Sequence, residues 1–359
     1  MSNAVRVFPL VVLSLLLATW SGWIRIGWSL PIDTVAGEHG DLMVNSFLAS
    51  LIFLERAVTF KNKWVLLWPA INALSVIAFL TGNLSLGRIM LIMGSTGFII
   101  ACAYLIIQHK HLYYYVFLAA ACCLLIGNVI LYKTHFYPNA ITWWIGFLLF
   151  TIVAERLELS RYLPLTSVKR TILIVALAGV LFAIFWPFHL SGNYILAVPI
   201  AITSLWLLKY DMARHSIKVK GSHRYSGWLL IVGYVWLLIM SVLLLIQRII
   251  PFNYDAILHS FFIGFVFSMI FSHAPIILPA VTKLPIKIYR PVLYLWFFIL
   301  QASLLTRIIA DLLGNVTIRK WSGMINGISI LCFFVTIVFT VRQELTKKKQ
   351  LSTRKVVAA

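Results

Sequence analysis

The chain has 359 residues, of which 62% are hydrophobic and only 11% are charged. Soluble domains carry roughly a quarter charged residues, so this chain has too few to cover a water-exposed surface of its size. Its mean hydropathy of +0.96 points the same way. The composition therefore predicts a polytopic membrane protein. It excludes a disordered chain, a disulfide-rich secreted scaffold and a free-standing nucleic-acid-binding protein.

Apolar runs of about 18 to 22 residues, the length that crosses a bilayer as a helix, follow one another along the chain. They predict an all-α membrane bundle of about twelve transmembrane helices, near residues 7–26, 39–58, 63–82, 86–108, 112–132, 138–156, 170–188, 192–209, 226–248, 255–280, 290–313 and 322–342. The first run lacks a small-residue cleavage site, so we expect it to be retained as a helix.

The basic residues predict an orientation. With a cytoplasmic N-terminus, 23 of the 30 Lys and Arg residues fall in inner segments and six in outer ones, as the positive-inside rule requires. An odd number of spans would break this alternation. We therefore expect residues 1–345 to form one transmembrane domain with both termini in the cytoplasm, and residues 346–359 to form a basic cytoplasmic tail near anionic lipid.

Three predicted spans, each four helices apart, end in similar polar segments. The second span ends with Glu55 and Arg56, the sixth ends with Glu155 and Arg156, and the tenth ends near His273. This spacing fits three pseudo-repeats of four helices. A Glu-Arg pair at a helix end also arises easily by chance, so the repeat stays a hypothesis.

Ionisable groups inside a bilayer are costly, so each is a candidate for function. In the tenth span, one helical face carries Asp255, His259, Phe262, Val266, Met269 and His273. Fourteen residues rise about 21 Å, so His259 and His273 mark an outer and an inner position and cannot share one metal ion. Asp255 lies one turn before His259, where its carboxylate can accept a hydrogen bond from the second ring nitrogen, as metal-bound histidines require. It could equally cap the helix.

Two further spans carry polar faces. In the second, Asp41 and Glu55 lie on one stripe, with His39 just before it. In the eleventh, Arg307 and Asp311 are one turn apart and can pair. A polar path through Asp41, Glu55, Glu155, Asp255, Arg307 and Asp311 would suit a secondary transporter, the alternative function. The prolines lie mostly toward helix ends, however, whereas transporters often break helices near the midplane.

Common soluble-enzyme signatures are missing. The chain has no phosphate-binding loop, zinc-protease motif or serine-hydrolase elbow, so ATP-driven work and soluble-type hydrolysis are not expected, and enzymatic activity is left open. The cysteines lie inside apolar runs without the spacing of a zinc or iron–sulfur site, and we interpret them as small buried hydrophobes; they are Cys102, Cys122, Cys123 and Cys332.

The second and tenth spans carry four notable segments: GEHGDLM at 37–43, LIFLERAV at 51–58, LHSFFIGF at 258–265 and SMIFSHAP at 268–275. These segments resemble the NnrS family. Its members are twelve-helix bacterial membrane proteins that hold haem and copper, act in the response to nitric oxide, and are similar in architecture to the catalytic subunit of haem-copper oxidases. The likeness covers the whole chain in helix count and these two spans in motif.

The resemblance implies a bacterial inner-membrane haem protein that binds or responds to nitric oxide, or transfers electrons near the periplasmic face. It implies His39, His259 and His273 as cofactor-binding candidates, with His39 and His259 as metal ligands, and neutral imidazoles suit haem iron. The family's second helix starts with two histidines and this chain has one, so haem is the expected cofactor and copper is left open.

The expected partners are membrane lipid and a small diatomic ligand, with no nucleic acid. The sixth and seventh spans lack the histidine pair of an oxidase, so a proton-pumping oxidase is not expected.

Overall fold

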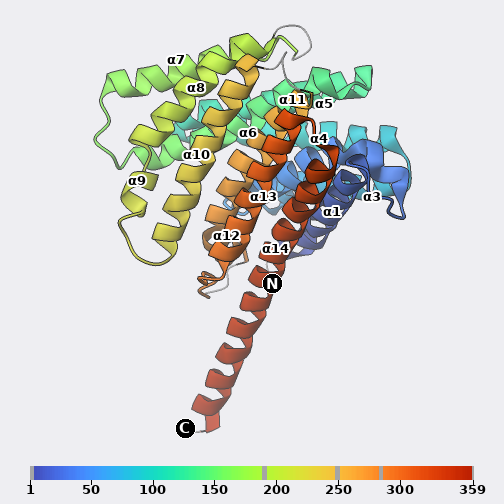
Figure 1. Cartoon of the computed structure of the whole chain (residues 1–359). Coiled ribbons are helices and arrows are strands. Elements are labelled where there is room, and N and C mark those ends of the chain that lie inside the picture. The colour runs from blue at the N-terminus through green and yellow to red at the C-terminus, as the bar shows by residue number, and fades with distance from the viewer. Residues whose placement is uncertain (1–3, 188–191, 247–250, 283–285, 358–359) are drawn as a thin grey trace.

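A computed structural model describes residues 4–187, 192–246, 251–282 and 286–357 (Figure 1). All regular structure in these residues is helical, which confirms the predicted all-α class. The helices are α1 (Ala4–Arg25), η1 (Asp33–Glu38), η2 (Asp41–Ala49), α2 (Ser50–Ala57), η3 (Lys63–Leu66), α3 (Leu67–Leu80), α4 (Leu84–His109), α5 (Leu112–Thr134), α6 (Tyr137–Ser160), α7 (Ser167–Ala183), α8 (Gly192–Tyr210), α9 (Ala213–Ser216), α10 (Ser222–Ile246), α11 (Asn253–His259), η6 (Ser260–Phe267), α12 (Ser268–Thr282), α13 (Leu293–Leu313) and α14 (Val316–Val357).

Each of the twelve predicted spans coincides with a helix or with a stack of consecutive helices. Among the described residues, ten helices are long and apolar enough to cross a membrane. The other two predicted spans are the helix formed by η2 and α2, which changes type partway, and α7, which has 17 residues. The chain thus has the helical architecture of a multi-pass membrane protein.

Local signals set several helix ends. The side chain of Asn83 accepts a hydrogen bond from the backbone N–H of Leu86 at 3.1 Å and caps the start of α4. At the other end of the chain, α13 stops at Gly314, whose φ of 69° is the left-handed conformation that glycine adopts at helix C-termini. These ends fix where the loops begin, and so where the polar residues beside them lie.

Helix α6 lies at the centre of the bundle. In its most apolar stretch 94% of residues are buried, against 33% to 67% in the other long apolar helices. Its buried face includes Trp144, Phe147 and Phe150, and large apolar side chains of this kind dominate a packed core. A helix that is apolar on all sides belongs inside a bundle, surrounded by other helices.

Two π-helices interrupt the second and tenth predicted spans. The nine residues of η2 follow His39 and Gly40, and the eight residues of η6 follow His259. Next to η2, the side chain of Asn72 donates to the backbone carbonyl of Asn45 at 2.8 Å. π-Helical stretches are rare and occur frequently at functional sites. Both occur here directly after a histidine that the sequence singles out.

The C-terminal residues continue α14 as a helix through Val357, and this end of the helix extends well beyond the rest of the bundle (Figure 1). The predicted boundary at residue 345 falls inside this helix, because the lysines, glutamine and leucine that follow are good helix formers. The basic tail from residue 346 is therefore helical as far as the structure describes it.

Candidate ligand cavity

A cavity of about 610 Å³ lies between α1, the η1–η2 junction, the start of α6, the α11–η6 junction, α13 and α14. His39 and His259 both line it. Most of its wall is apolar, with Met43, Phe262 and Phe267 among the lining residues. Ligand sites are typically concave, mostly apolar and of this size, with a few polar groups that fix orientation. We refer to it as the histidine cavity.

His39 connects η1 to η2 and is held by α1. Its Nδ1 lies 2.8 Å from the backbone carbonyl of Ala18. A carbonyl only accepts hydrogen bonds, so Nδ1 carries the ring proton and Nε2 carries the lone pair. Gly22 makes this approach possible, because a Cβ there would lie 2.9 Å from Cε1 of His39.

His259 ends α11 and has the same arrangement. Its Nδ1 lies 2.8 Å from the backbone carbonyl of Asp255 and 3.3 Å from the carboxylate of the same residue. The nearest acceptor is thus the Asp255 backbone rather than the predicted carboxylate. In the described part of the chain, Nε2 has no hydrogen-bond partner in His39 or in His259. Both rings therefore offer a free lone pair.

A group of four charged residues adjoins His259. Asp255 accepts two-pronged hydrogen bonds from Arg307, at 2.9 to 3.2 Å, and lies 3.1 Å from Arg319. Arg319 also pairs with the fully buried Asp311 at 2.9 Å. We call these four residues the Asp255 group.

The predicted pair within α13 between Arg307 and Asp311 is not formed. Arg307 pairs with Asp255 of α11 instead, and Arg319 of α14 pairs with Asp311. The carboxylate of Asp255 pairs with these arginines and makes no capping bond.

A second buried group of polar residues lies beside the histidine cavity and joins η1, η2, α4, the end of α5 and the start of α6. Arg88 of α4 donates to Glu38 at 3.0 Å, to Asp41 at 3.2 Å and to Nδ1 of His135 at 2.7 Å. The hydroxyl of Tyr137 lies 2.9 Å from Glu38 and 3.0 Å from Asp41. His135 and Tyr137 also line the histidine cavity. We call these five residues the Arg88 group.

The end of α5 places His135. Its φ of 53° is in the left-handed region, which non-glycine residues adopt rarely. The turn lets α5 stop and α6 begin two residues later, so that His135 and Tyr137 face the same space.

The three similar polar helix ends lie next to one another, at a place apart from the cavity. Arg56 of α2 donates to Glu155 of α6 at 2.9 Å, and Arg156 of α6 donates to Nε2 of His273 in α12 at 2.7 Å. Glu55 is within electrostatic reach of Arg56 and Glu155. These contacts join the three helices that the repeat hypothesis relates.

His273 therefore differs from the other two candidate histidines. Its Nε2 lone pair is taken by Arg156, its Nδ1 donates to the carbonyl of Met269 at 2.7 Å, and it does not line the histidine cavity. The residues of the predicted polar path likewise fall into separate groups: Asp41 in the Arg88 group, Asp255, Arg307 and Asp311 in the Asp255 group, and Glu55 and Glu155 beside Arg56.

The donors at the histidine cavity suit a haem better than a free metal ion. Among the described residues no three or more His, Cys, Asp or Glu side chains converge as an ion site would require. Haem needs only one or two protein ligands and a largely apolar enclosure, and the two imidazoles with free lone pairs would suit such a group. Trp23 Nε1 and Asn326 Oδ1, which line the cavity, are buried without a partner in the described residues.

A family described as "Domain of unknown function (DUF8744)" matches residues 5–342. The chain belongs to the DUF8744 family. The match runs from α1 into α14, so the histidine cavity and both charged groups lie within the DUF8744 domain. No curated protein and no solved structure matches the chain.

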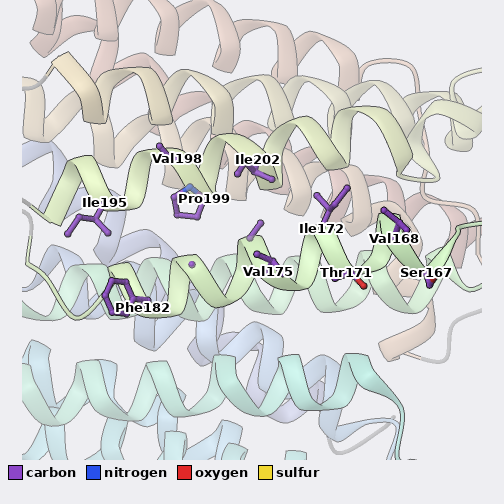
Figure 2. A pocket seen from close by; sticks show the side chains of 12 residues that line it. Ser167, Val168, Thr171, Ile172, Val175, Phe182, Ile195, Val198, Pro199 and Ile202 are labelled. Carbon is purple, nitrogen blue, oxygen red and sulfur yellow. The ribbon is translucent and has the colours of Figure 1, made fainter.

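The DUF8744 domain has a second hollow, a groove of about 670 Å³ between α7 and α8 (Figure 2). Figure 2 shows apolar side chains such as Val175, Phe182 and Ile202 along it, with Ser167 and Thr171 at one end. It contains no titratable or metal-ligating side chain. Of the two hollows, the histidine cavity is therefore the one that can support chemistry.

Several residues in or beside the histidine cavity were not predicted as site residues. Arg88 and Arg319 are among the six basic residues that the predicted topology places in outer segments, and Tyr137 lies just before the predicted span at 138–156. One signal was present, since Arg88 lies in an otherwise apolar helix and an intramembrane charge needs a partner. His189, another outer histidine, lies outside the described residues.

Proposed function

We propose that this DUF8744 protein is an NnrS-like haem protein of the bacterial inner membrane. It binds or responds to nitric oxide, or transfers electrons, near the periplasmic face. The proposal rests on one observation: His39 and His259 come from separate helices, line one cavity, and both keep Nε2 free because Nδ1 is bound to a backbone carbonyl.

The residues of the chain have distinct parts in this function. Haem, when bound, supplies the iron that takes a diatomic ligand or an electron. His39 and His259 would hold the iron, and the carbonyls of Ala18 and Asp255 hold each ring in the tautomer that a metal requires. Copper is not part of the proposal, because the family's second helix starts with two histidines and this chain has only His39 there.

The periplasmic placement rests on the distribution of charge. With the positive-inside orientation, the N-terminus and the basic C-terminal helix are cytoplasmic. Helix α1 ends at Arg25 and α14 begins at Val316, and both of these ends lie beside the histidine cavity. In this orientation the cavity lies toward the periplasmic side, where a ligand or an electron donor would reach it.

The visible spectrum of the full-length protein, purified in detergent from haem-replete cells, tests the proposal. We expect a Soret band that is lost or strongly weakened in His259→Ala. The matched control is His273→Ala, in the same predicted span but with Nε2 occupied by Arg156, which should keep the band. A colourless wild-type protein, or equal bands in both variants, would contradict the proposal.

A secondary transporter is the second candidate. The observation that favours it is the Asp255 group, because buried carboxylates and arginines beside a cavity are typical of ion and substrate paths. Proton uptake by proteoliposomes tests it: Asp311→Asn should slow a flux that the wild-type protein supports. If the wild-type protein transports neither protons nor any of the anions tested, the result contradicts the transporter function.

A further inference from the structure

The groove between α7 and α8 runs along the outside of the bundle. Helix α7 lies at the outer edge of the structure (Figure 1), and Val168, Val175 and Phe182 on its groove face are 66%, 64% and 59% exposed. Val198 of α8, on the other wall, is 58% exposed. Exposed apolar surface of this extent marks a contact with a membrane or a ligand. An apolar molecule can therefore enter the groove from the membrane.

The groove is as long as a lipid chain in one leaflet. It extends along α7 from Ser167 to Phe182, which are 15 residues apart, and 15 residues rise about 22 Å in a helix. One leaflet contributes half of the roughly 30 Å hydrocarbon core of a bilayer. With a volume of about 670 Å³, the groove can hold an acyl chain along its length.

The two ends of the groove differ in polarity. Phe182 lies near one end, and the side chains of Ser167 and Thr171 lie at the other (Figure 2). The hydroxyl end is where α7 begins and α8 finishes, and Trp206 joins the two helices there, because its Nε1 donates to the backbone carbonyl of Lys169 at 2.7 Å. An apolar wall that ends in hydroxyls matches an acyl chain followed by the oxygens of a glycerol backbone.

Two lysines lie beyond the hydroxyl end. Nζ of Lys169 is 5.1 Å and Nζ of Lys209 is 5.4 Å from the centre of the Tyr210 ring, which is within the range of a cation–π contact. Lys209 follows the groove residue Ile202 by seven positions, so it continues the groove face of α8. Two positive charges beside one ring attract an anion.

The neighbouring sequence offers these lysines no negative charge. From residue 159 to residue 210 there is no Asp or Glu, and Asp211 comes next. Asp211 is only 2% exposed, and its Oδ1 accepts a hydrogen bond from the hydroxyl of Tyr234 at 2.9 Å. Within the residues that the structure describes, neither Lys169 nor Lys209 forms an ion pair. The hydroxyl end of the groove therefore presents positive charge to an anion from outside the chain.

We propose that the α7–α8 groove binds one anionic phospholipid of the cytoplasmic leaflet. An acyl chain lies along the apolar wall, the glycerol oxygens lie at Ser167 and Thr171, and the phosphate lies at Lys169 and Lys209. In the positive-inside orientation this end of the groove is cytoplasmic, where anionic lipid attracts basic residues. The site does not depend on whether haem is bound.

Native mass spectrometry of the full-length protein in detergent tests the site. The probes are phosphatidylglycerol, which is anionic, and phosphatidylcholine with the same acyl chains, which has no net charge. We expect the wild-type protein to bind phosphatidylglycerol more tightly than phosphatidylcholine. In the double variant Lys169→Gln/Lys209→Gln, this preference should fall about fivefold for each lysine, which corresponds to about 1 kcal/mol per basic residue.

The matched control is Lys61→Gln/Lys63→Gln, which removes two exposed lysines from another predicted inner segment and should keep the preference. Equal affinity of the wild-type protein for the two lipids would overturn the proposal. The same preference in both double variants would also overturn it.

Val175→Trp tests the groove itself. Because Val175 is exposed, the larger side chain fills the groove without displacing the core. It should weaken binding of both lipids about tenfold or more, as the loss of about two buried methylene contacts already implies. Val335→Trp, at a 66% exposed position of α14, should leave binding unchanged. Equal lipid affinities in these two variants would overturn the assignment to the groove.

Two other occupants of the groove predict different results. A dimer that Val175→Trp dissociates, in a protein without lipid preference, would assign the groove to a second copy of the chain. Displacement of bound phosphatidylglycerol by inorganic phosphate would assign the lysines to a free anion. Either result would overturn the lipid site.

Discussion

Arg307 of α13 donates hydrogen bonds from both Nε and Nη2 to the carboxylate of Asp255 in α11, at 3.1 and 2.9 Å. Two-pronged arginine–carboxylate pairs are the strongest and most directional ion pairs in proteins. This pair fixes the start of α11 and hence the position of His259 one turn later.

Removal of Asp255 should therefore cost stability as well as position. Asp255→Asn leaves the buried Arg307 without its counter-charge, and breaking a buried pair in this way costs about 3–5 kcal/mol. Thermal unfolding of the purified protein in detergent measures the effect as a clear fall in Tm. Arg290→Gln breaks a partly exposed pair with Glu344 and should cost less than about 1 kcal/mol. Equal shifts in the two variants would show that the Asp255 group is not a stabilising centre.

Gly22 tests the position of His39 without removing its imidazole. In Gly22→Ala the new Cβ would lie 2.9 Å from Cε1 of His39, so the ring must move or the helix must shift. Haem binding should weaken about tenfold or more, as a misplaced ligand implies, in a titration of the protein with haem. Gly37→Ala is the matched control, because a Cβ there meets nothing within 4 Å. The same affinity in both variants would argue against His39 as a ligand.

Asn72 should stabilise the π-helix η2. Its side chain donates to the carbonyl of Asn45 at 2.8 Å and to the hydroxyl of Ser50 at 2.9 Å, and it is fully buried. Asn72→Leu removes these two hydrogen bonds and leaves the Asn45 carbonyl with the backbone N–H of Ser50 as its donor, and each lost hydrogen bond costs about 0.5–1.5 kcal/mol. Thermal unfolding again reads the loss. Thr96→Val, which removes an exposed hydroxyl that bonds only within α4, should cost far less.

The orientation can be measured in intact cells. In a background without native cysteines, Lys133→Cys should react with a membrane-impermeant maleimide, because the end of α5 lies on the periplasmic side of the proposed topology. Lys347→Cys, in the exposed C-terminal part of α14, should react only after the cells are opened. The reverse labelling pattern would place the histidine cavity toward the cytoplasmic side of the membrane and contradict the proposed orientation.

The sequence predicted most of the helices because membrane helices are specified locally, by the length and apolar character of each run. It also pointed to His39 and His259, since a polar residue within an apolar helix is conspicuous on its own. A pattern along the sequence does not predict contacts between distant segments. Whether Arg307 pairs with Asp311 or with Asp255 depends on how α11, α13 and α14 pack, and spacing along one helix does not contain that information.

The π-helices η2 and η6 show the same limit. Their residues have the apolar composition of ordinary helices, and a local pattern does not include contacts with neighbours such as the hydrogen bond from Asn72 to Asn45. His273 is a candidate residue that the sequence pointed to and that the structure places in a different environment. Its position on the stripe with His259 was visible, but its partner Arg156 comes from another helix and takes the lone pair that a ligand would need.

The most direct test of the central claim is chemical rescue of a missing ligand. His259→Gly should lose the spectrum of a histidine-ligated haem, and added imidazole should occupy the vacated space and restore it to near the wild-type form, whereas His273→Gly should need no rescue. If the spectrum of His259→Gly equals that of the wild type, or if imidazole leaves a lost spectrum unchanged, His259 does not hold a haem in this cavity.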